Sequence, residues 1–265
     1  MSKSLLQAST LALLFISLST PHANAATVSL LDQFDDGNIA TNTGLGGIGS
    51  GFTTSYVDCG SGMGVSASES GGKATVTGAS CVHWLQSNDA IDPTRTTMIW
   101  SIDSLPSTTS QGAYIGWVQA GKDACCETGI YLSIEGHRVT FDMQAKSGND
   151  PFQWQGRYFD IPAGSTAPGE VYPGYSSGPL TAILSLDSTG WQISIQGEGV
   201  DIVKSGTYTS CPNPLNGVDG QCISLTDVLT YPGVNGTLRP VAGSFRENLS
   251  ADFGSVLVVS NPLVP

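Results

Sequence analysis

Four oxygen-bearing side chains lie close together near the start of the chain: Asp32, Asp35, Asp36 and Asn38, with Gly37 between them. Carboxylate and amide oxygens beside a glycine that permits a sharp turn are components of a calcium site. Calcium takes about six to eight oxygens, and the sequence around this cluster specifies no second acidic group that completes the set. The alternative is a solvated turn whose aspartates accept hydrogen bonds from their own backbone. Asp35 and Asp36 are thus candidate ligands of a structural calcium ion, and no other cofactor is indicated.

Aromatic residues with polar neighbours form the second group of candidate functional residues. They suit a sugar, because a sugar stacks on a ring while its hydroxyl groups need hydrogen bonds. Alternation along a strand places Trp154 and Tyr158 on one face and polar residues on the other. One face must be buried, so the alternative is a half-buried strand with Trp154 in the core. The stretch 162–179 is rich in Gly, Pro and Ser, and we expect its tyrosines to be exposed. The candidate ligand-binding residues are Trp154, Tyr158, Tyr172 and Tyr175.

Signals of catalysis are weak. Hydrolysis of a glycosidic bond needs two carboxyl groups about 5–9 Å apart. Glu127, Glu135 and Asp142 are separated in the sequence and would have to converge through folding. The chain has no Gly-x-Ser-x-Gly motif, and His83 and His137 have no supporting context for Ser/His/Asp chemistry. The sequence therefore favours a protein that is not an enzyme.

The chain contains six cysteines, an even number that suggests disulfides in an exported protein. Proximity in the sequence favours two short loops, Cys59 with Cys81 and Cys211 with Cys222. Cys125 and Cys126 are adjacent, and they form either a vicinal disulfide or two free thiols. A zinc site is not expected because the chain has no C-x-x-C spacing.

The first 25 residues have the pattern of a signal peptide. Lys3 precedes the apolar run 11–18, and small residues lead to Ala25, after which we expect cleavage. The apolar run is too short to span a membrane, so the predicted product is a secreted or periplasmic protein of residues 26–265. The net charge of −12 argues against binding to nucleic acid or insertion into anionic membranes, although acidity also serves solubility alone.

Strand patterns recur along the chain, and helix patterns are nearly absent. Alternating or continuous apolar runs predict strands at 97–102, 113–118, 129–135, 139–143, 180–186 and 191–195. Turn residues at 135–138 and 187–190 predict two hairpins, and 224–229 is the one moderate helix candidate. We predict an all-β fold in a single domain over 26–265, because β-sandwiches of this size commonly have one core.

Several short motifs are similar to those of secreted concanavalin A-like or laminin G-like domains. They are 32–38, 47–52, 112–117, the strand that begins at Trp191, and 250–256. The resemblance implies a jelly-roll sandwich of two antiparallel sheets with the first and last strands side by side. It also implies that Asp252 approaches the acidic cluster and completes the calcium site. The glycanases of this fold carry a Glu-x-Asp-x-x-Glu signature, which this chain lacks.

These observations predict an exported, noncatalytic β-sandwich that binds a carbohydrate or a surface partner. Two alternatives stay open: a glycan-active hydrolase or lyase whose carboxylates come from separate strands, and a structural component of an extracellular matrix or surface. The fold by itself does not separate them, since it hosts all three kinds of protein.

Overall fold

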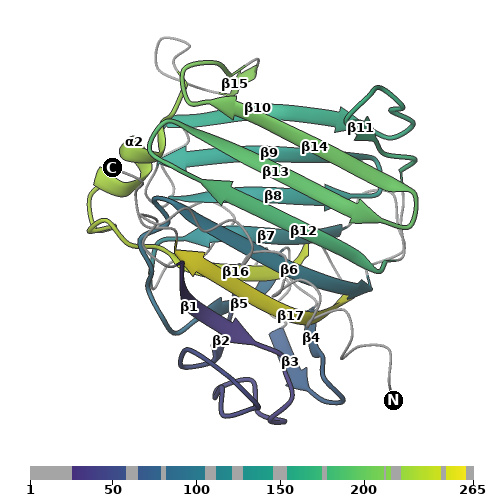
Figure 1. The fold of residues 1–265 in the computed structure, drawn as a ribbon, viewed down its shortest axis with the longest axis vertical. Helices are drawn as coiled ribbons and strands as arrows, with labels where there is room; N and C mark the ends of the chain where they lie inside the picture. Colours follow the sequence, from purple (N-terminus) through teal and green to yellow (C-terminus); the bar gives the residue numbers. More distant parts are fainter. Residues whose placement is uncertain are drawn as a thin grey trace, which may run out of the picture.

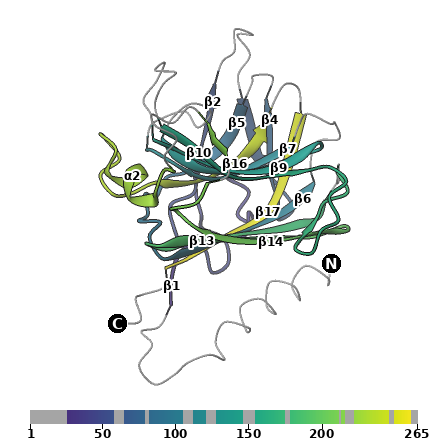
Figure 2. The same cartoon turned by 90° about the horizontal axis from the view of Figure 1, so that it is seen from above.

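The computed structural model describes residues 26–57, 65–78, 82–104, 112–120, 128–145, 154–174, 178–211, 213–215, 222–245 and 249–260. Nearly all of them belong to two antiparallel sheets that lie face to face (Figures 1 and 2). The predicted all-β sandwich is confirmed. No helix in these ranges is long and apolar enough to cross a membrane.

One sheet has nine strands and the other has eight. The order in the nine-stranded sheet is β11 (Glu170–Val171), β14 (Val200–Thr207), β13 (Gly190–Gly197), β12 (Leu180–Leu186), β6 (Thr96–Ser104), β17 (Leu249–Ser260), β4 (Ala74–Gly78) and β3 (Val65–Glu69), with β1 (Thr27–Asp32) also paired to β17. The order in the eight-stranded sheet is β15 (Asn213–Leu215), β10 (Trp154–Pro162), β9 (Arg138–Ala145), β8 (Gly129–Glu135), β7 (Gly112–Val118), β16 (Arg239–Phe245), β5 (Val82–Ser87) and β2 (Phe52–Val57). The first and last strands are antiparallel neighbours, as the resemblance implied.

The hydrophobic core lies between the sheets and is rich in aromatic rings. Trp100 on β6 packs against Phe253, Phe52 and Phe34, with ring centroids 5.4–6.4 Å apart. Trp117, on β7, is fully buried in the same core. Because successive side chains of a strand point to opposite faces, filling this core decides which residues each sheet presents outward.

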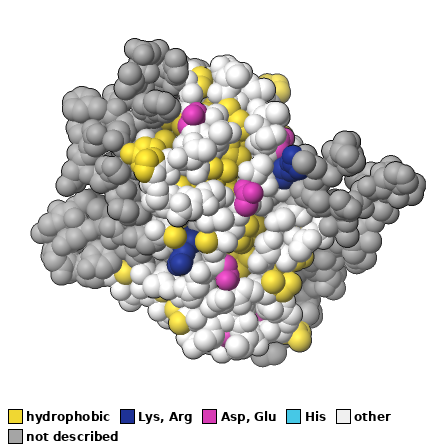
Figure 3. Space-filling view, turned by 90° about the vertical axis from the view of Figure 1, so that its left-hand side faces the viewer, with side chains coloured by type: hydrophobic (Ala, Val, Ile, Leu, Met, Phe, Trp, Pro, Cys, Tyr) yellow, Lys and Arg dark blue, Asp and Glu magenta, His cyan; other side chains and the backbone are white. Residues whose placement is uncertain are grey.

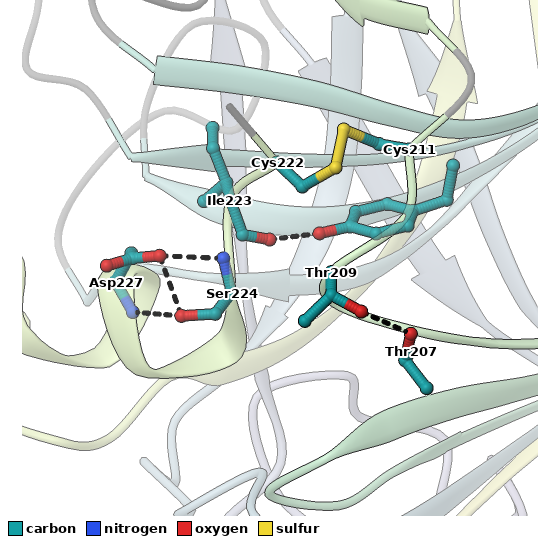
Figure 4. The surroundings of a disulfide bond; sticks show 8 residues. Thr207, Thr209, Cys211, Cys222, Ile223, Ser224 and Asp227 are labelled. Atoms are coloured by element: carbon teal, nitrogen blue, oxygen red, sulfur yellow. Dashed lines mark hydrogen bonds between the residues drawn. A yellow bond between two sulfur atoms is a disulfide. The ribbon is translucent and has the colours of Figure 1, made fainter. Parts of the chain in front are cut away.

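The predicted turns and helix are present, and local hydrogen bonds explain them. Asp187 directly follows β12. Its carboxylate accepts hydrogen bonds from the backbone N–H groups of Thr189 (2.6 Å) and Gly190 (2.8 Å). The helix α2 (Leu225–Thr230) begins after Ser224, whose hydroxyl accepts from the Asp227 N–H while the Asp227 carboxylate accepts from the Ser224 N–H (Figure 4). This reciprocal capping satisfies groups that a short helix otherwise leaves unpaired.

Among the described residues on the side of the molecule shown in Figure 3, charged side chains are sparse, and most of the surface of these residues belongs to polar uncharged groups and backbone. This agrees with a chain in which charged residues are only 12%. Contacts on such a surface depend on hydrogen bonds and shape more than on net charge.

The predicted disulfide between Cys211 and Cys222 is confirmed, and it lies beside the start of α2 (Figure 4). It joins the end of the chain segment after β14 to the segment that leads into the helix. Cys59, Cys81, Cys125 and Cys126 lie outside the described residues.

Replacing Cys211 and Cys222 together by serine is expected to lower the free energy of unfolding by about 3 kcal/mol, because the unfolded chain regains the entropy of a closed loop of 11 residues. Urea denaturation monitored by tryptophan fluorescence measures this change. Thr209→Ser, a neighbouring exposed substitution, is the control. An unchanged midpoint in the double variant would contradict the prediction.

Candidate functional site

The outer face of the eight-stranded sheet collects polar and aromatic side chains from strands that are distant in the sequence. On β8, Ile130, Leu132 and Ile134 belong to the core cluster, so Tyr131 and Ser133 project from the opposite face. The same alternation on the other strands defines this outer face. Although its side chains point away from the core, most of them are buried.

The strand register arranges this outer face in rows that run across the sheet. One row is Gln86, Val241, Gly116, Tyr131, Asp142 and Arg157. The next is Trp84, Gly243, Tyr114, Ser133, Thr140 and Asp160. A third is Arg239, Val118, Gly129 and Gln144. Each row brings together residues from β5, β16, β7, β8, β9 or β10 that no local motif links.

Two tyrosines and several glycines form the middle of these rows. The rings of Tyr114 and Tyr131 contact each other with centroids 5.1 Å apart. The Tyr131 ring occupies the space that a Cβ at Gly129 would take, whereas at Gly243 that space is taken by the His83 carbonyl oxygen and by Cβ and Cα of Trp84. Gly129 therefore leaves room for the Tyr131 ring, and Gly243 permits a close approach of β5.

A continuous chain of ion pairs lies at the β8–β9–β10 end of this face. Arg157 binds Asp142 through Nε (2.8 Å) and Nη2 (3.2 Å), and its Nη1 lies 3.1 Å from Asp160. Arg138 lies 3.7 Å from both Asp160 and Glu135. Burial favours the neutral form of Arg157, but the hydrogen bonds and charges of Asp142 and Asp160 outweigh it and raise the pKa of Arg157.

The positions of the carboxylates in these ion pairs bear on hydrolysis, which needs two carboxyl groups close together. In the strand register, Glu135 of β8 lies opposite Arg138 of β9. Asp142 of β9 lies opposite Tyr131, which is four residues from Glu135 along β8. At about 3.4 Å per residue, that offset separates the two backbone positions by about 13 Å. Glu135 and Asp142 do not converge, and each carboxylate faces an arginine. Glu127, the third carboxylate considered from the sequence, lies outside the described residues.

Five buried polar atoms of the outer face have no hydrogen-bond partner among the described residues. They are Nε1 of Trp84, Nε2 of Gln86, Oε1 of Gln144 and the Nε atoms of Arg138 and Arg239. Most buried polar groups in proteins are hydrogen-bonded, so such atoms call for an explanation, and a ligand or ordered water is a common one. Two donors on β5 and one acceptor on β9 lie on the two sides of the tyrosine pair, since β16, β7 and β8 separate these strands.

The sequence analysis missed these residues and selected others. Tyr158 and Tyr172 belong to the hydrophobic core cluster and not to the outer face, so the expectation that these rings offer exposed sugar-binding platforms is wrong. Each hydroxyl donates to a backbone carbonyl, of Ile223 and Glu135 respectively, and burial raises both tyrosine pKa values. The side chain of Trp154 and the whole of Tyr175 lie outside the described residues.

The acidic cluster near the N-terminus behaves as a hydrogen-bonded turn around Asp36. Its carboxylate accepts from the backbone N–H groups of Thr43 (2.7 Å) and Asn38 (2.9 Å) and from the hydroxyls of Thr41 and Thr43 (each 2.9 Å). These bonds hold the pKa of Asp36 far below its usual range. This is the arrangement that the solvated-turn alternative predicted.

Asp252 does not complete that cluster. Its carboxylate accepts hydrogen bonds from Thr75 (2.7 Å) and Ser104 (2.9 Å). Asp252 lies four residues along β17 from Val256, which is the residue that pairs with Asp32. The acid that reaches the cluster is instead Glu69, which accepts from the Gly37 N–H at 2.7 Å.

Calcium binding stays a prediction, without the ligand set that the sequence suggested. Among the described residues, Asp35, Asp36 and Asp252 included, no three His, Cys, Asp or Glu side chains are grouped so that they could hold a metal ion. Asp32 and Glu69 are both buried, and each has one carboxylate oxygen without a partner in the described structure. These are the two buried carboxylate oxygens of the cluster without a partner among the described residues.

Arg157→Gln is expected to lower the free energy of unfolding by about 3–5 kcal/mol, because it leaves the buried carboxylate of Asp142 without its charged partner. Arg138→Gln is the matched control and should cost at most about 1 kcal/mol, since its side chain is more exposed and its ion pairs are long. Urea denaturation at pH 7 measures both values. Equal costs would show that Arg157 does not serve to neutralise Asp142.

Asp32 is expected to make the protein less stable as the pH rises. Burial, followed by the charges of Asp36 and Asp35, raises the pKa of Asp32 to about 6 against its hydrogen bond from Phe34, so the folded state favours the protonated acid. The stability of the folded state that comes from protonated Asp32 is fully present below about pH 4 and is lost as the pH rises through about 6. The free energy of unfolding falls by about 2–3 kcal/mol over this range.

Unfolding free energies of the native chain and of Asp32→Asn at pH 4.5 and 7.5 provide the measurement. The difference between native and variant should shift by that amount in favour of Asp32→Asn at pH 7.5. Asp201→Asn, an exposed carboxylate on β14, should leave the pH dependence as it is. If Asp32→Asn showed the same pH dependence of the unfolding free energy as the native chain, the raised pKa of Asp32 would be refuted.

Comparison with solved structures identifies proteins of the same fold. The CBM2 module of the evolved Dit protein of Lactobacillus casei BL23 phage J-1 is 9% identical, with TM-score 0.52 and coverage of 91% of this chain and 98% of that one. An immunostimulatory antigen and pseudo β-1,3-glucanase of Mycobacterium tuberculosis is 11% identical, with TM-score 0.51 and coverage of 88% and 100%. A β-1,3-glucanase from Mycobacterium marinum is 12% identical, with TM-score 0.51 and coverage of 89% and 100%.

These similarities confirm the jelly-roll β-sandwich at the level of the fold. The concanavalin A-like and laminin G-like assignments stay predictions. No protein-family model matches the sequence, and no curated protein matches it either.

Proposed function

We propose that this protein is a noncatalytic glycan-binding β-sandwich that holds a sugar chain on the outer face of its eight-stranded sheet. The observation that carries the proposal is the set of buried, unpartnered polar atoms on Trp84, Gln86 and Gln144 beside the Tyr114–Tyr131 pair. Sugars combine apolar ring faces with hydroxyl groups that both donate and accept hydrogen bonds. The described part of this outer face offers both kinds of partner.

The charges of the outer face favour a neutral glycan. Arg157 and Arg138 are already matched by Asp142, Asp160 and Glu135, so an acidic sugar would compete with existing ion pairs there. Arg239 is the remaining arginine in the described rows of this face, and it has no ion pair among the described residues. The protein as a whole is acidic, with a net charge of −12, which disfavours polyanions further.

Binding without hydrolysis is supported by the state of the carboxylates. A glycosidase needs one carboxyl group that is protonated and a second that is free to act as base or nucleophile. Here Asp142 is bound by Arg157 through two nitrogens, and Glu135 lies about 13 Å away along the strands by backbone spacing. Proteins of the same fold include a CBM2 module and a pseudo β-1,3-glucanase as well as a β-1,3-glucanase.

Gln86→Met combined with Gln144→Met is expected to weaken binding of a neutral β-glucan oligosaccharide about tenfold without lowering stability. An unpartnered buried amide costs stability, so an apolar side chain of similar shape is neutral or stabilising in the free protein. Tenfold corresponds to about 1.4 kcal/mol. Calorimetric titration with laminarihexaose and cellohexaose measures the affinity, and Gln196→Met on β13 is the exposed control.

Two results would count against the proposal. Unchanged affinity in the double variant would show that the oligosaccharide does not bind to the outer face of the eight-stranded sheet. Shortened oligosaccharides in the mass spectrum after incubation with the native protein would instead favour the hydrolase or lyase alternative.

We also propose that the chain is exported with loss of residues 1–25. The support is the basic start, the apolar run and the small residues before Ala26. N-terminal sequencing of protein recovered from the medium or periplasm should give Ala26 as the first residue.

A further inference from the structure

Three unpartnered hydrogen-bond donors lie on two adjacent strands of the outer face of the eight-stranded sheet. Nε1 of Trp84 and Nε2 of Gln86 come from β5, and Nε of Arg239 comes from β16. All three nitrogens are buried and have no hydrogen-bond partner among the described residues. Trp84 and Gln86 are 0% and 6% exposed. Because a buried donor without an acceptor costs free energy, the three together call for an acceptor that the described residues do not supply.

The strand register places these three side chains next to one another. Gln86 lies opposite Val241, and Arg239 is two residues from Val241 on the same face of β16. Diagonal neighbours of this kind are about 7–8 Å apart, which long side chains can span. Trp84 is two residues from Gln86 on the same face of β5. A single small group above Val241 is therefore within reach of all three donors.

Glycine adjoins this group of donors on the side of the tyrosine pair. Gly116 of β7 lies opposite Val241, and Tyr131 of β8 follows in the same row. Gly116 has no side chain, so nothing at that position separates a sugar ring on the tyrosines from a substituent at the donors. The Tyr114–Tyr131 pair and the three donors thus suit two parts of one ligand.

Arg239 differs from the other arginines of this face because it has no acid beside it among the described residues. Arg157 lies 2.8 Å and 3.1 Å from two carboxylates, and Arg138 lies 3.7 Å from each of two. A guanidinium keeps its positive charge in proteins, and a hydrogen bond from a charged donor is roughly twice as strong as a neutral one. The charge of Arg239 is therefore available to an anionic group of a ligand.

The three donors select an acceptor that carries negative charge. A sugar hydroxyl must also place its own proton, whereas a carboxylate only accepts and has about four lone-pair sites on two oxygens. Building on the glycan-binding function proposed above, we infer that Trp84, Gln86 and Arg239 hold the carboxylate of a uronic acid. The remainder of the bound chain is neutral, because the arginines at the β8–β10 end are already paired and a net charge of −12 disfavours a polyanion.

Two matched monosaccharides test this assignment. Methyl β-D-glucuronide and methyl β-D-glucoside differ only at C6, which is a carboxylate in the first and a CH₂OH group in the second. Each is titrated into the ¹⁵N-labelled protein at pH 7 while NMR follows the indole N–H signal of Trp84, assigned with Trp84→Phe. The glucuronide should bind about tenfold more tightly, because its carboxylate accepts a charge-assisted hydrogen bond.

Arg239→Gln should abolish this preference and leave the affinity for the glucoside unchanged. Its melting temperature should match that of the native chain, because no described acid loses a partner. Arg95→Gln is the matched control, since it removes the same charge directly before β6 of the other sheet. It should keep the full preference for the glucuronide.

Failure of this assignment and failure of the proposed function give different results. If the glucoside and laminarihexaose bind and the glucuronide has no advantage, the uronic acid assignment is wrong and glycan binding stands. If laminarihexaose does not bind but the glucuronide binds through Arg239, the neutral chain is wrong and the carboxylate site stands. If no sugar shifts the Trp84 signal, both are wrong.

Three further results would overturn the assignment. A preference for the glucuronide that survives in Arg239→Gln would show that another group binds the carboxylate. Acetate that binds as tightly as the glucuronide would assign the donors to a free anion, and tighter binding of glucose 6-sulfate would assign them to sulfated sugars. A large drop in the melting temperature of Arg239→Gln, with the sugar preference unchanged, would show that Arg239 serves the chain's own fold.

Discussion

The close packing of the two sheets is the constraint on which the rest of the structure depends. Trp100 with its phenylalanine neighbours fills one part of the interlayer space, and Phe141, Phe159 and Trp191 fill another, with centroids 5.0–6.4 Å apart. Once these rings are inside, a strand cannot slip by one residue without moving its apolar set into water. The outward residues of each strand are then fixed, and with them the two polar faces.

The two outer faces differ in their electrostatic character, although they belong to one small sandwich. The face of the eight-stranded sheet contains buried ion pairs that hold Arg157, Asp142 and Asp160 in one arrangement. A buried pair of this kind adds little net stability, but removing one partner is costly, so it fixes geometry. The face of the nine-stranded sheet has hydroxyl and amide groups with few charges.

The fold constrains function only loosely. Proteins with the same sandwich at 9–12% identity include a binding module, a pseudo-enzyme and a glucanase. What separates these roles is the identity and spacing of a few outward side chains, not the sheets themselves. In this chain Asp142 and Glu135 of the eight-stranded sheet are paired with arginine and separated along the strands, and the unpartnered polar atoms of the described outer face belong to an indole, two amides and two arginines.

The sequence by itself determined the elements and the local contacts. Alternation predicted the strands, Asp187 and Gly190 predicted a hairpin, Ser224 to Leu229 predicted the helix, and the spacing of Cys211 and Cys222 predicted their disulfide. Each of these depends on residues within about a dozen positions of one another, where the backbone geometry limits the choices. The pairing of β1 with β17 came from the resemblance to a known fold, because no local signal specifies it.

Only the tertiary structure decided the sites. Tyr172 is buried because its loop folds back and its hydroxyl reaches the carbonyl of Glu135, and Glu69 rather than Asp252 meets the Asp36 turn because of how β3, β4 and β17 align. The alternation of Thr140, Asp142 and Gln144 in one predicted strand was a signal for an outward polar row, but nothing in the sequence places Gln86 or Arg157 in line with it. Such rows depend on the order and register of strands far apart in the chain, which are set by the packing of the whole core.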